Sequence, residues 1–311
     1  MQKGKHMASK MAKINQIDHT ILLGAHFSIA GGLHKAVATA AEYGCSAVQL
    51  FTKNASTWKE RRLSAQEIEQ FNAARQDSEI RFLCTHAAYL INLASPDRRT
   101  HERSVKALAH ELMRSSQLGI PYVILHPGAH KGKGEDQGLR RVGESINAVF
   151  EEVSDKTCHL LLETTAGQGT NLGHHFEQLA AISEMVEAKE RLGFCLDTCH
   201  VFAAGYDLRT KKAYDRTLSA FDRIVGLERL HVIHVNDAKK GLGSRVDRHE
   251  HIGQGAIGME AFRFIVNDSR LRSMAKILET PKNDRVDHDR LNLERLRALV
   301  VDGDGRGPFT S

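Results

Sequence analysis

Eight short apolar runs, separated by longer segments with helical periodicity, constrain the fold of this chain more than any other feature of its sequence. We expect strands at residues 21–26, 47–51, 80–86, 122–126, 159–163, 193–197, 231–235 and 275–279. Apolar side chains recur at spacings of three and four, as in amphipathic helices, within the intervening residues 32–43, 98–117, 138–153 and 175–188. Near-continuous apolar strands that alternate with helices are typical of a parallel sheet covered by helices.

Eight such units over roughly 280 residues predict an α/β fold, a single-domain (β/α)8 TIM barrel with its active site at the C-terminal strand ends. The alternative is an open doubly wound sheet, which is disfavoured because no GxGxxG motif follows the first run. Residues 20–300 contain no linker rich in Pro, Gly or Ser, so we assign them to one domain. Residues 1–19 are expected to be an N-terminal extension, either tag-derived or disordered, and residues 301–311 a flexible tail.

The cysteines and the lengths of the apolar runs indicate the cellular compartment of the protein and whether it associates with a membrane. No run of about 18 apolar residues occurs, so we expect no membrane partner. The 5 cysteines are odd in number and form no CxxC pair, which favours buried thiols over a disulfide framework. Such thiols are typical of a reducing compartment, so we expect the protein in the cytoplasm. The formal net charge of +5 permits a polyanionic partner.

The polar residues at the ends of the apolar runs predict a metal site. Six runs end in a histidine or a carboxylate: His86, His126, Glu163, Asp197, His234 and Glu279. In a parallel barrel all C-terminal strand ends meet at one mouth, where three carboxylates would repel one another and lose water. A divalent cation removes both problems, and six ligands exceed what one tetrahedral zinc accepts. Two metals that share a bridging carboxylate, with Glu163 as the bridge, satisfy the whole set.

A third metal is suggested by three further residues. His200 follows Asp197 by three residues, and Asp247 and His249 are spaced i, i+2, so their side chains point the same way in an extended segment. A cluster of this size suits phosphoryl chemistry. Each residue alone has an ordinary structural explanation, such as Asp197 capping a helix, but six coincidences at equivalent positions are harder to explain.

The other histidines are weighed differently, although 18 histidines in one chain is a high number. We expect His26, at the end of the first run, to support the ligands without binding metal. The following are expected to be exposed or structural: His34, His101, His110, His174, His175 and His251.

Several long motifs, in order, resemble endonuclease IV, the metal-dependent apurinic/apyrimidinic (AP) endonuclease family of DNA repair. They occupy residues 24–33, 50–54, 89–93, 163–169, 197–207, 236–239 and 243–249. The resemblance implies a TIM barrel with a trinuclear, usually zinc, cluster. Its first metal would take His86, His126 and the shared Glu163. The second would add Asp197, His234 and Glu279, and the third would take His200, Asp247 and His249.

The resemblance also implies an activity and a substrate. The family hydrolyses the phosphodiester 5′ to an AP site in double-stranded DNA, leaving a 3′-hydroxyl and a 5′-deoxyribose phosphate, and it cleans blocked 3′ ends. Glu163 or Glu279 would orient or deprotonate the attacking water, and the sequence does not separate ligand from base. Manganese or iron remains open beside zinc. We expect a monomer.

DNA contacts are expected from the loops at the barrel mouth. Tyr89 and Leu90 match residues that the family inserts into the bent duplex. Polar and basic residues suited to phosphate contacts are Lys53, Asn54, Lys239, Arg245 and Arg248. Two positions depart from the family: Ser56 stands where an arginine is common, and Ala87 where an acidic residue is common.

Two other functions fit part of the pattern. A metal-dependent sugar isomerase or epimerase also places His, Glu and Asp at the strand ends of a barrel, but it does not need the extra set of His200, Asp247 and His249. A damaged-DNA binder without activity is disfavoured because the ligand set is complete.

Overall fold

The computed structural model describes residues 21–283 and 285–301. The expected extension at residues 1–19 and the expected tail from residue 302 onward lie outside the described residues. Among the described helices, none has both the length and the apolar character that a membrane crossing requires. All five cysteines are buried and carry free thiols, as the sequence predicts.

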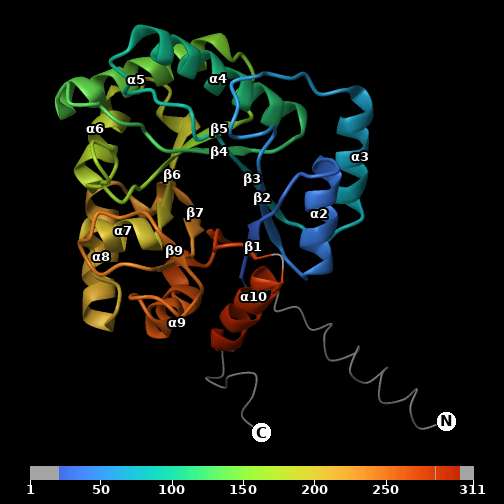
Figure 1. The fold of residues 1–311 in the computed structure, drawn as a ribbon, viewed down its shortest axis with the longest axis vertical. Coiled ribbons are helices and arrows are strands. Elements are labelled where there is room, and N and C mark those ends of the chain that lie inside the picture. Colours follow the sequence, from blue (N-terminus) through green and yellow to red (C-terminus); the bar gives the residue numbers. More distant parts are fainter. Residues whose placement is uncertain (1–20, 284, 302–311) are drawn as a thin grey trace, which may run out of the picture.

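Eight parallel strands close into a barrel, which confirms the predicted (β/α)8 architecture (Figure 1). Around the barrel they are β1 (Leu23–His26), β10 (Ala275–Leu278), β7 (Leu230–His234), β6 (Leu192–Asp197), β5 (His159–Glu163), β4 (Tyr122–Leu125), β3 (Phe82–His86) and β2 (Ala47–Leu50). The barrel closes because β1 pairs with both β10 and β2. Its strands therefore have no free edge.

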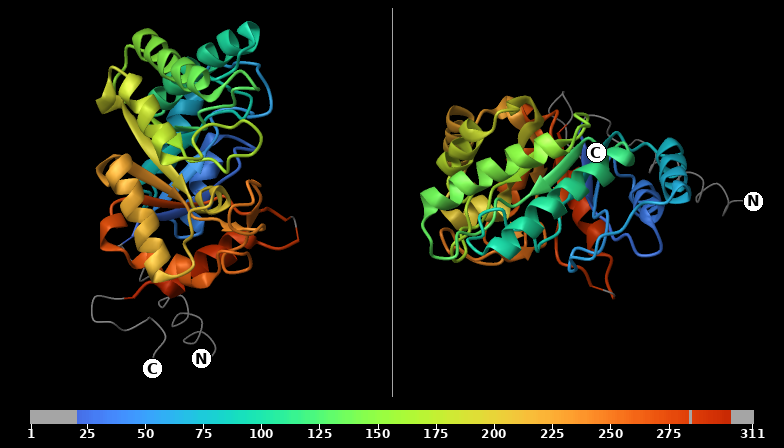
Figure 2. Two further views of the ribbon diagram at one scale, coloured as in Figure 1. Left: turned by 90° about the vertical axis from the view of Figure 1, so that its left-hand side faces the viewer. Right: turned by 90° about the horizontal axis from the view of Figure 1, so that it is seen from above.

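Helices cover the outside of this barrel (Figures 1 and 2). The α-helices are α2 (Leu33–Glu42), α3 (Ala65–Gln76), α4 (Arg98–Gln117), α5 (Glu135–Glu152), α6 (Phe176–Met185), α7 (Thr198–Ala204), α8 (Lys211–Ile224), α9 (Met259–Asn267) and α10 (His288–Leu299). Three short 3-10 helices are η1 (Lys189–Arg191), η2 (Leu227–Arg229) and η3 (Ser269–Leu271). The main hydrophobic core lies between the strands and these helices.

The strand alternation explains how the barrel presents polar side chains at its mouth. A second, smaller apolar cluster fills the barrel interior and includes Cys84, Ile124, Leu161, Cys195, Val232 and Ile277. Each of these is followed two residues later by one of the six predicted ligands at the run ends. Because side chains two apart in a strand point to the same face, the ligands continue the interior-facing rows up to the mouth. His126 and Glu279 lie one residue past their strands rather than inside them.

The connection after β7 contains two short strands beyond the eight expected from the sequence. Two short antiparallel strands, β8 (Asp237–Ala238) and β9 (His249–Glu250), form a hairpin there. The buried Asp237 carboxylate stabilises the start of this hairpin. It accepts hydrogen bonds from the backbone N–H groups of Ala238 at 2.8 Å and Ile257 at 2.9 Å. We call residues 239–248 between the two strands the hairpin loop. His249 is thereby fixed in a strand at the barrel mouth.

Candidate metal centre

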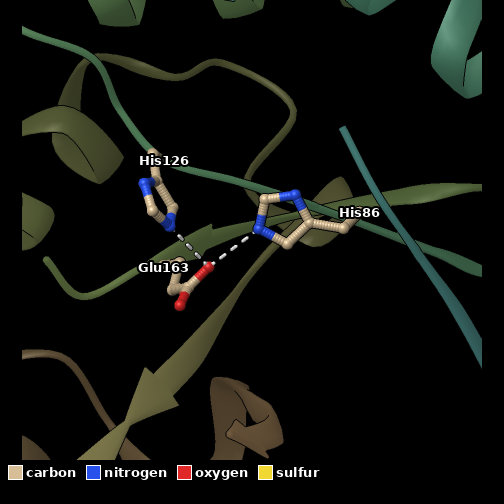
Figure 3. Close-up of side chains that lie close together, drawn as sticks. All are labelled: His86, His126 and Glu163. Carbon is tan, nitrogen blue, oxygen red and sulfur yellow. Dashed lines mark hydrogen bonds and ion pairs between the residues drawn. The ribbon is translucent and has the colours of Figure 1, made fainter. Parts of the chain in front are cut away.

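The first group of potential ligands brings two histidines to one oxygen of a buried carboxylate (Figure 3). His86 Nε2 lies 3.1 Å and His126 Nε2 lies 3.0 Å from Glu163 Oε2. His86 Nδ1 donates to the carbonyl oxygen of Ala87 at 2.8 Å, so its Nε2 is the nitrogen that faces Glu163. These are the three residues predicted for the first metal.

The second group forms around the other oxygen of the same carboxylate. His234 Nδ1 lies 3.0 Å from Glu163 Oε1, 3.2 Å from Glu279 Oε2 and 3.8 Å from Asp197 Oδ2. Glu163 therefore presents one oxygen to each group, which is the arrangement expected of a bridging carboxylate. The four residues are those predicted for the second metal.

The third group lies beside the second and joins α7 to the hairpin. Asp247 Oδ1 is 3.3 Å from His200 Nε2 and 3.6 Å from His249 Nε2. The Nδ1 atoms of these two histidines donate to the carbonyl oxygens of Thr164 at 2.8 Å and Glu279 at 3.0 Å. Each Nε2 is thus directed at Asp247.

Asp197 serves two of these groups and a helix. Its Oδ1 accepts a hydrogen bond from the backbone N–H of His200 at 2.9 Å. Asp197 therefore caps α7, the structural role that the sequence also suggested for it. Its Oδ2 lies 3.6 Å from His249 Nε2 and accepts from Asn236 Nδ2 at 2.6 Å. The capping and the ligand interpretations of Asp197 are therefore compatible, because they use different oxygens.

The donor sets fit divalent ions. Two tetrahedral ligand atoms each about 2.1 Å from one ion lie about 3.4 Å apart, and the nitrogen–oxygen distances above scatter around that value. Among the described residues, His200 Nε2 and His249 Nε2 are buried without a hydrogen-bond partner. A buried nitrogen left unpaired is costly unless something binds it, and a metal ion would satisfy both.

The charges of the centre are those that metal ligation needs. Burial alone would raise the pKa of Glu163, but His234 and His126 beside it hold that pKa well below its usual range. Burial would likewise raise the pKa of Glu279, and His234 holds it well below. Burial opposes protonation of His200, yet Asp197 and Asp247 raise its pKa well above the ordinary value. Glu163 and Glu279 are therefore ionised, and a metal would displace a proton from His200.

Two thiols also lie within reach of these groups: Cys195 beside His234 and Cys199 beside His249. Burial raises the pKa of each thiol to about 12. A neutral thiol is a poor metal ligand, because the thiolate is the ligating form. We therefore treat both cysteines as interior packing residues, as the sequence predicts.

Gln49, on β2, lies at the same level of the barrel and is not among the residues predicted from the sequence. Its Oε1 accepts from His234 Nε2 at 2.7 Å, and its Nε2 donates to Glu279 Oε1 at 2.5 Å and to His26 Nδ1 at 2.9 Å. The strand pattern could have indicated Gln49, because it follows Ala47 by two residues and Ala47 belongs to the apolar cluster inside the barrel. His26 lies next to the ligands, 3.7 Å from Glu279, where a supporting residue was expected.

The residues predicted to contact DNA are placed differently from one another. Tyr89 is 67% exposed, and its ring lies 5.4 Å from that of Phe51 and 5.6 Å from that of His86, measured between centroids. Leu90 beside it is half-buried. The other exposed members are Asn54 after β2 and, in the hairpin loop, Lys239, Arg245 and Arg248.

Lys53 is the exception, because its side chain is only 3% exposed. The ammonium donates to the carbonyl oxygen of Thr57 at 2.6 Å and lies 3.8 Å from Glu60 Oε1. It therefore holds the loop after β2 together from inside, and its placement does not support the predicted phosphate contact. The histidines expected to be exposed or structural all lie outside the three ligand groups.

The chain is similar to known proteins over most of its length. The family model described as "Xylose isomerase-like TIM barrel" matches residues 37–299. The chain is 50% identical over 277 residues to a probable endonuclease 4 of Chloroflexus aggregans, covering 89% of this chain and 97% of that protein. The crystal structure of endonuclease IV from Thermus thermophilus superposes with a TM-score of 0.80 at 40% identity, covering 89% of this chain and 98% of that one.

A structure titled as a D-tagatose 3-epimerase-like protein also superposes, with a TM-score of 0.66 over 88% of this chain and 95% of that one. Its sequence identity is 19%, so this likeness concerns the fold alone.

Proposed function

Since the chain belongs to the endonuclease 4 family of xylose isomerase-like TIM barrels, we propose that it is a DNA repair endonuclease that incises 5′ to AP sites. The products would be a 3′-hydroxyl and a 5′-deoxyribose phosphate, and blocked 3′ ends would be cleaned by the same phosphodiesterase chemistry. The observation that carries the proposal is the convergence of nine ligand-type side chains, from β3 to β10, into three adjoining groups at one barrel mouth.

The three groups are proposed to hold three divalent ions, with Glu163 shared between the first two. Histidine nitrogens and carboxylate oxygens suit zinc, and manganese or iron can share such sites. When bound, these ions would supply charge neutralisation on the phosphate and a water of lowered pKa.

The solvent exposure of the Glu163 and Glu279 side chains supports a different role for each glutamate. Glu163 is fully buried beneath the centre, so its proposed role is to bridge and to hold the histidines in place. The Glu279 side chain is 15% exposed, which leaves it able to meet a water and accept its proton. The scissile phosphate would approach over His126 and Asp247, whose side chains are 31% and 42% exposed.

Damage recognition would rest on the loops around the mouth. An AP nucleotide has no base to unpair or unstack, so it costs less to extrude than an intact one. Tyr89 and Leu90 are proposed to enter the duplex at that position. Phosphate contacts are proposed for four exposed residues: Asn54, Lys239, Arg245 and Arg248. The protein is expected to act as a monomer.

A duplex that contains one tetrahydrofuran AP analogue tests this function. The zinc-loaded protein should incise 5′ of the analogue, and Glu163→Ala and Glu279→Gln should each abolish incision. Arg98→Met, on the exposed face of α4, is the matched control that keeps activity. An uncut duplex after incubation with metal-loaded wild-type protein would refute the proposal, and turnover of a ketose without DNA cleavage would favour the epimerase alternative.

A further inference from the structure

The histidines at the mouth differ in what fixes the orientation of their rings. His86, His200 and His249 each donate Nδ1–H to a backbone carbonyl oxygen, so their Nε2 atoms face the candidate ions. His234 is reversed: its Nδ1 faces the carboxylates, and its Nε2 lies 2.7 Å from the side chain of Gln49. Of these four rings, His234 is therefore the one whose orientation depends on a replaceable side chain.

The hydrogen bonds of Gln49 leave a single consistent assignment of its amide. Glu279 Oε1, 2.5 Å away, is a carboxylate oxygen and an acceptor, so the Gln49 atom facing it is the donating Nε2. The amide oxygen then faces His234 Nε2, which must carry a proton. The second N–H of the amide points to His26 Nδ1 at 2.9 Å.

We propose that Gln49 is a positioning residue that pre-organises the second metal site by holding His234 as the Nε2–H tautomer and by orienting Glu279. With Nε2 protonated, the Nδ1 lone pair is the one available to an ion between Glu163, Asp197 and Glu279. With Oε1 of Glu279 bound to the amide, Oε2 is turned toward His234 Nδ1 at 3.2 Å. This inference rests on the proposed metal cluster and adds a residue outside its ligands.

Gln49 is enclosed, so water cannot replace it in the native barrel. Its side chain is 0% exposed, and the Cys84 thiol donates a weak hydrogen bond to its Oε1 at 3.6 Å. A methionine of similar volume would fill the space without forming the hydrogen bonds to His234 and Glu279. His234 Nε2 would then be unpaired, and Glu279 would be free to rotate. Loss of such an outer contact typically lowers metal affinity about 10- to 100-fold.

The test compares wild-type, Gln49→Met and the matched control Cys84→Ala after equilibration with zinc and a competing chelator. Cys84→Ala removes only the weak thiol hydrogen bond to the Gln49 oxygen and leaves the amide's contacts with His234, Glu279 and His26 in place. We expect about three tightly held zinc ions per chain in wild-type and control. In Gln49→Met one of the three should be held about 10- to 100-fold more weakly. Activity should fall through kcat with KM for the duplex unchanged, because Gln49 does not reach the mouth surface.

A second readout addresses the tautomer directly. In the zinc-loaded wild-type protein, the His234 Nε2–H bonded to the amide should give a slowly exchanging downfield proton signal by NMR, which should be lost in Gln49→Met and kept in Cys84→Ala. Gln49→Ala replaces the methionine variant if the latter does not fold. Equal zinc affinity and an unchanged signal in the folded Gln49 variant would overturn this inference alone. A wild-type protein that binds no zinc would overturn it together with the metal cluster.

Discussion

Arg114 anchors the loop after β2 to helix α4, and replacing it with methionine tests how much that anchor stabilises the protein. Its Nε donates to Thr52 Oγ1 at 2.8 Å, its Nη2 lies 2.9 Å from Glu111 Oε2, and its Nη1 pairs with Glu60. Arg114 and Glu111 are buried, whereas the Glu60 side chain is 28% exposed. The loop carries Asn54, one of the proposed DNA contacts.

The expected cost follows from what the substitution leaves behind. Arg114→Met keeps most of the buried stem but leaves Glu111 with one partner, the hydroxyl of Thr52 at 2.5 Å. Removing one member of a buried ion pair costs about 3–5 kcal/mol, and the partly exposed Glu60 can regain water. We therefore expect the free energy of unfolding to fall by about 3–5 kcal/mol. The melting temperature should drop by roughly 10 °C, at about 2–4 °C per kcal/mol.

Urea unfolding of the zinc-loaded protein, followed by circular dichroism, measures this loss. Arg98→Met on the same helix removes an exposed pair with Glu102 and should leave the unfolding midpoint unchanged. The double variant Arg114→Met/Glu111→Leu removes both buried charges and should recover at least half of the loss. If Arg114→Met unfolds at the same urea concentration as Arg98→Met, the anchor does not stabilise the protein and the reasoning fails.

Three further outcomes are expected. Tyr89→Ala should weaken binding of the tetrahydrofuran duplex, measured by fluorescence anisotropy, by about 1–3 kcal/mol of stacking without changing the zinc content. Removing metal with a chelator should lower the melting temperature and abolish incision, and zinc should restore both, because ions that bind only the folded state stabilise it. Burial lowers the pKa of Lys276 to about 8, so between pH 8 and about 10.4 the folded state binds fewer protons than the unfolded state. Lys276 should therefore contribute a rise in the free energy of unfolding across that window, by at most about 3 kcal/mol. Urea titrations measure this contribution as the difference between the wild type and Lys276→Met, in which the opposing contributions of the buried thiols cancel.

The barrel and the candidate ligands could be predicted from the sequence because both follow from short-range regularities. Apolar runs of strand length alternating with helical periodicity imply parallel strands, whose C-terminal ends must meet. A polar residue two positions after an inward-facing apolar one must also face inward, which places Glu163 above Leu161 and His234 above Val232.

Contacts between distant segments could not be predicted in this way. The i, i+2 spacing of Asp247 and His249 suggested an extended segment, but the hairpin that holds it depends on Asp237 binding the backbone of Gly255 and Ile257 about twenty residues later. The basic character of Lys53 suggested a DNA contact, but its burial follows from the positions of Thr57 and Glu60 in the folded loop.

The sequence by itself determined which side chains face the barrel mouth and what chemistry they can perform, because strand alternation is a local property of the backbone. Only the tertiary structure decided which of them meet and in what state. Gln49 and His234 are 185 residues apart, and they are brought to 2.7 Å by closure of the barrel. The proton on His234 Nε2, and hence the nitrogen left for a metal, depends on that contact and not on any neighbouring residue in the chain.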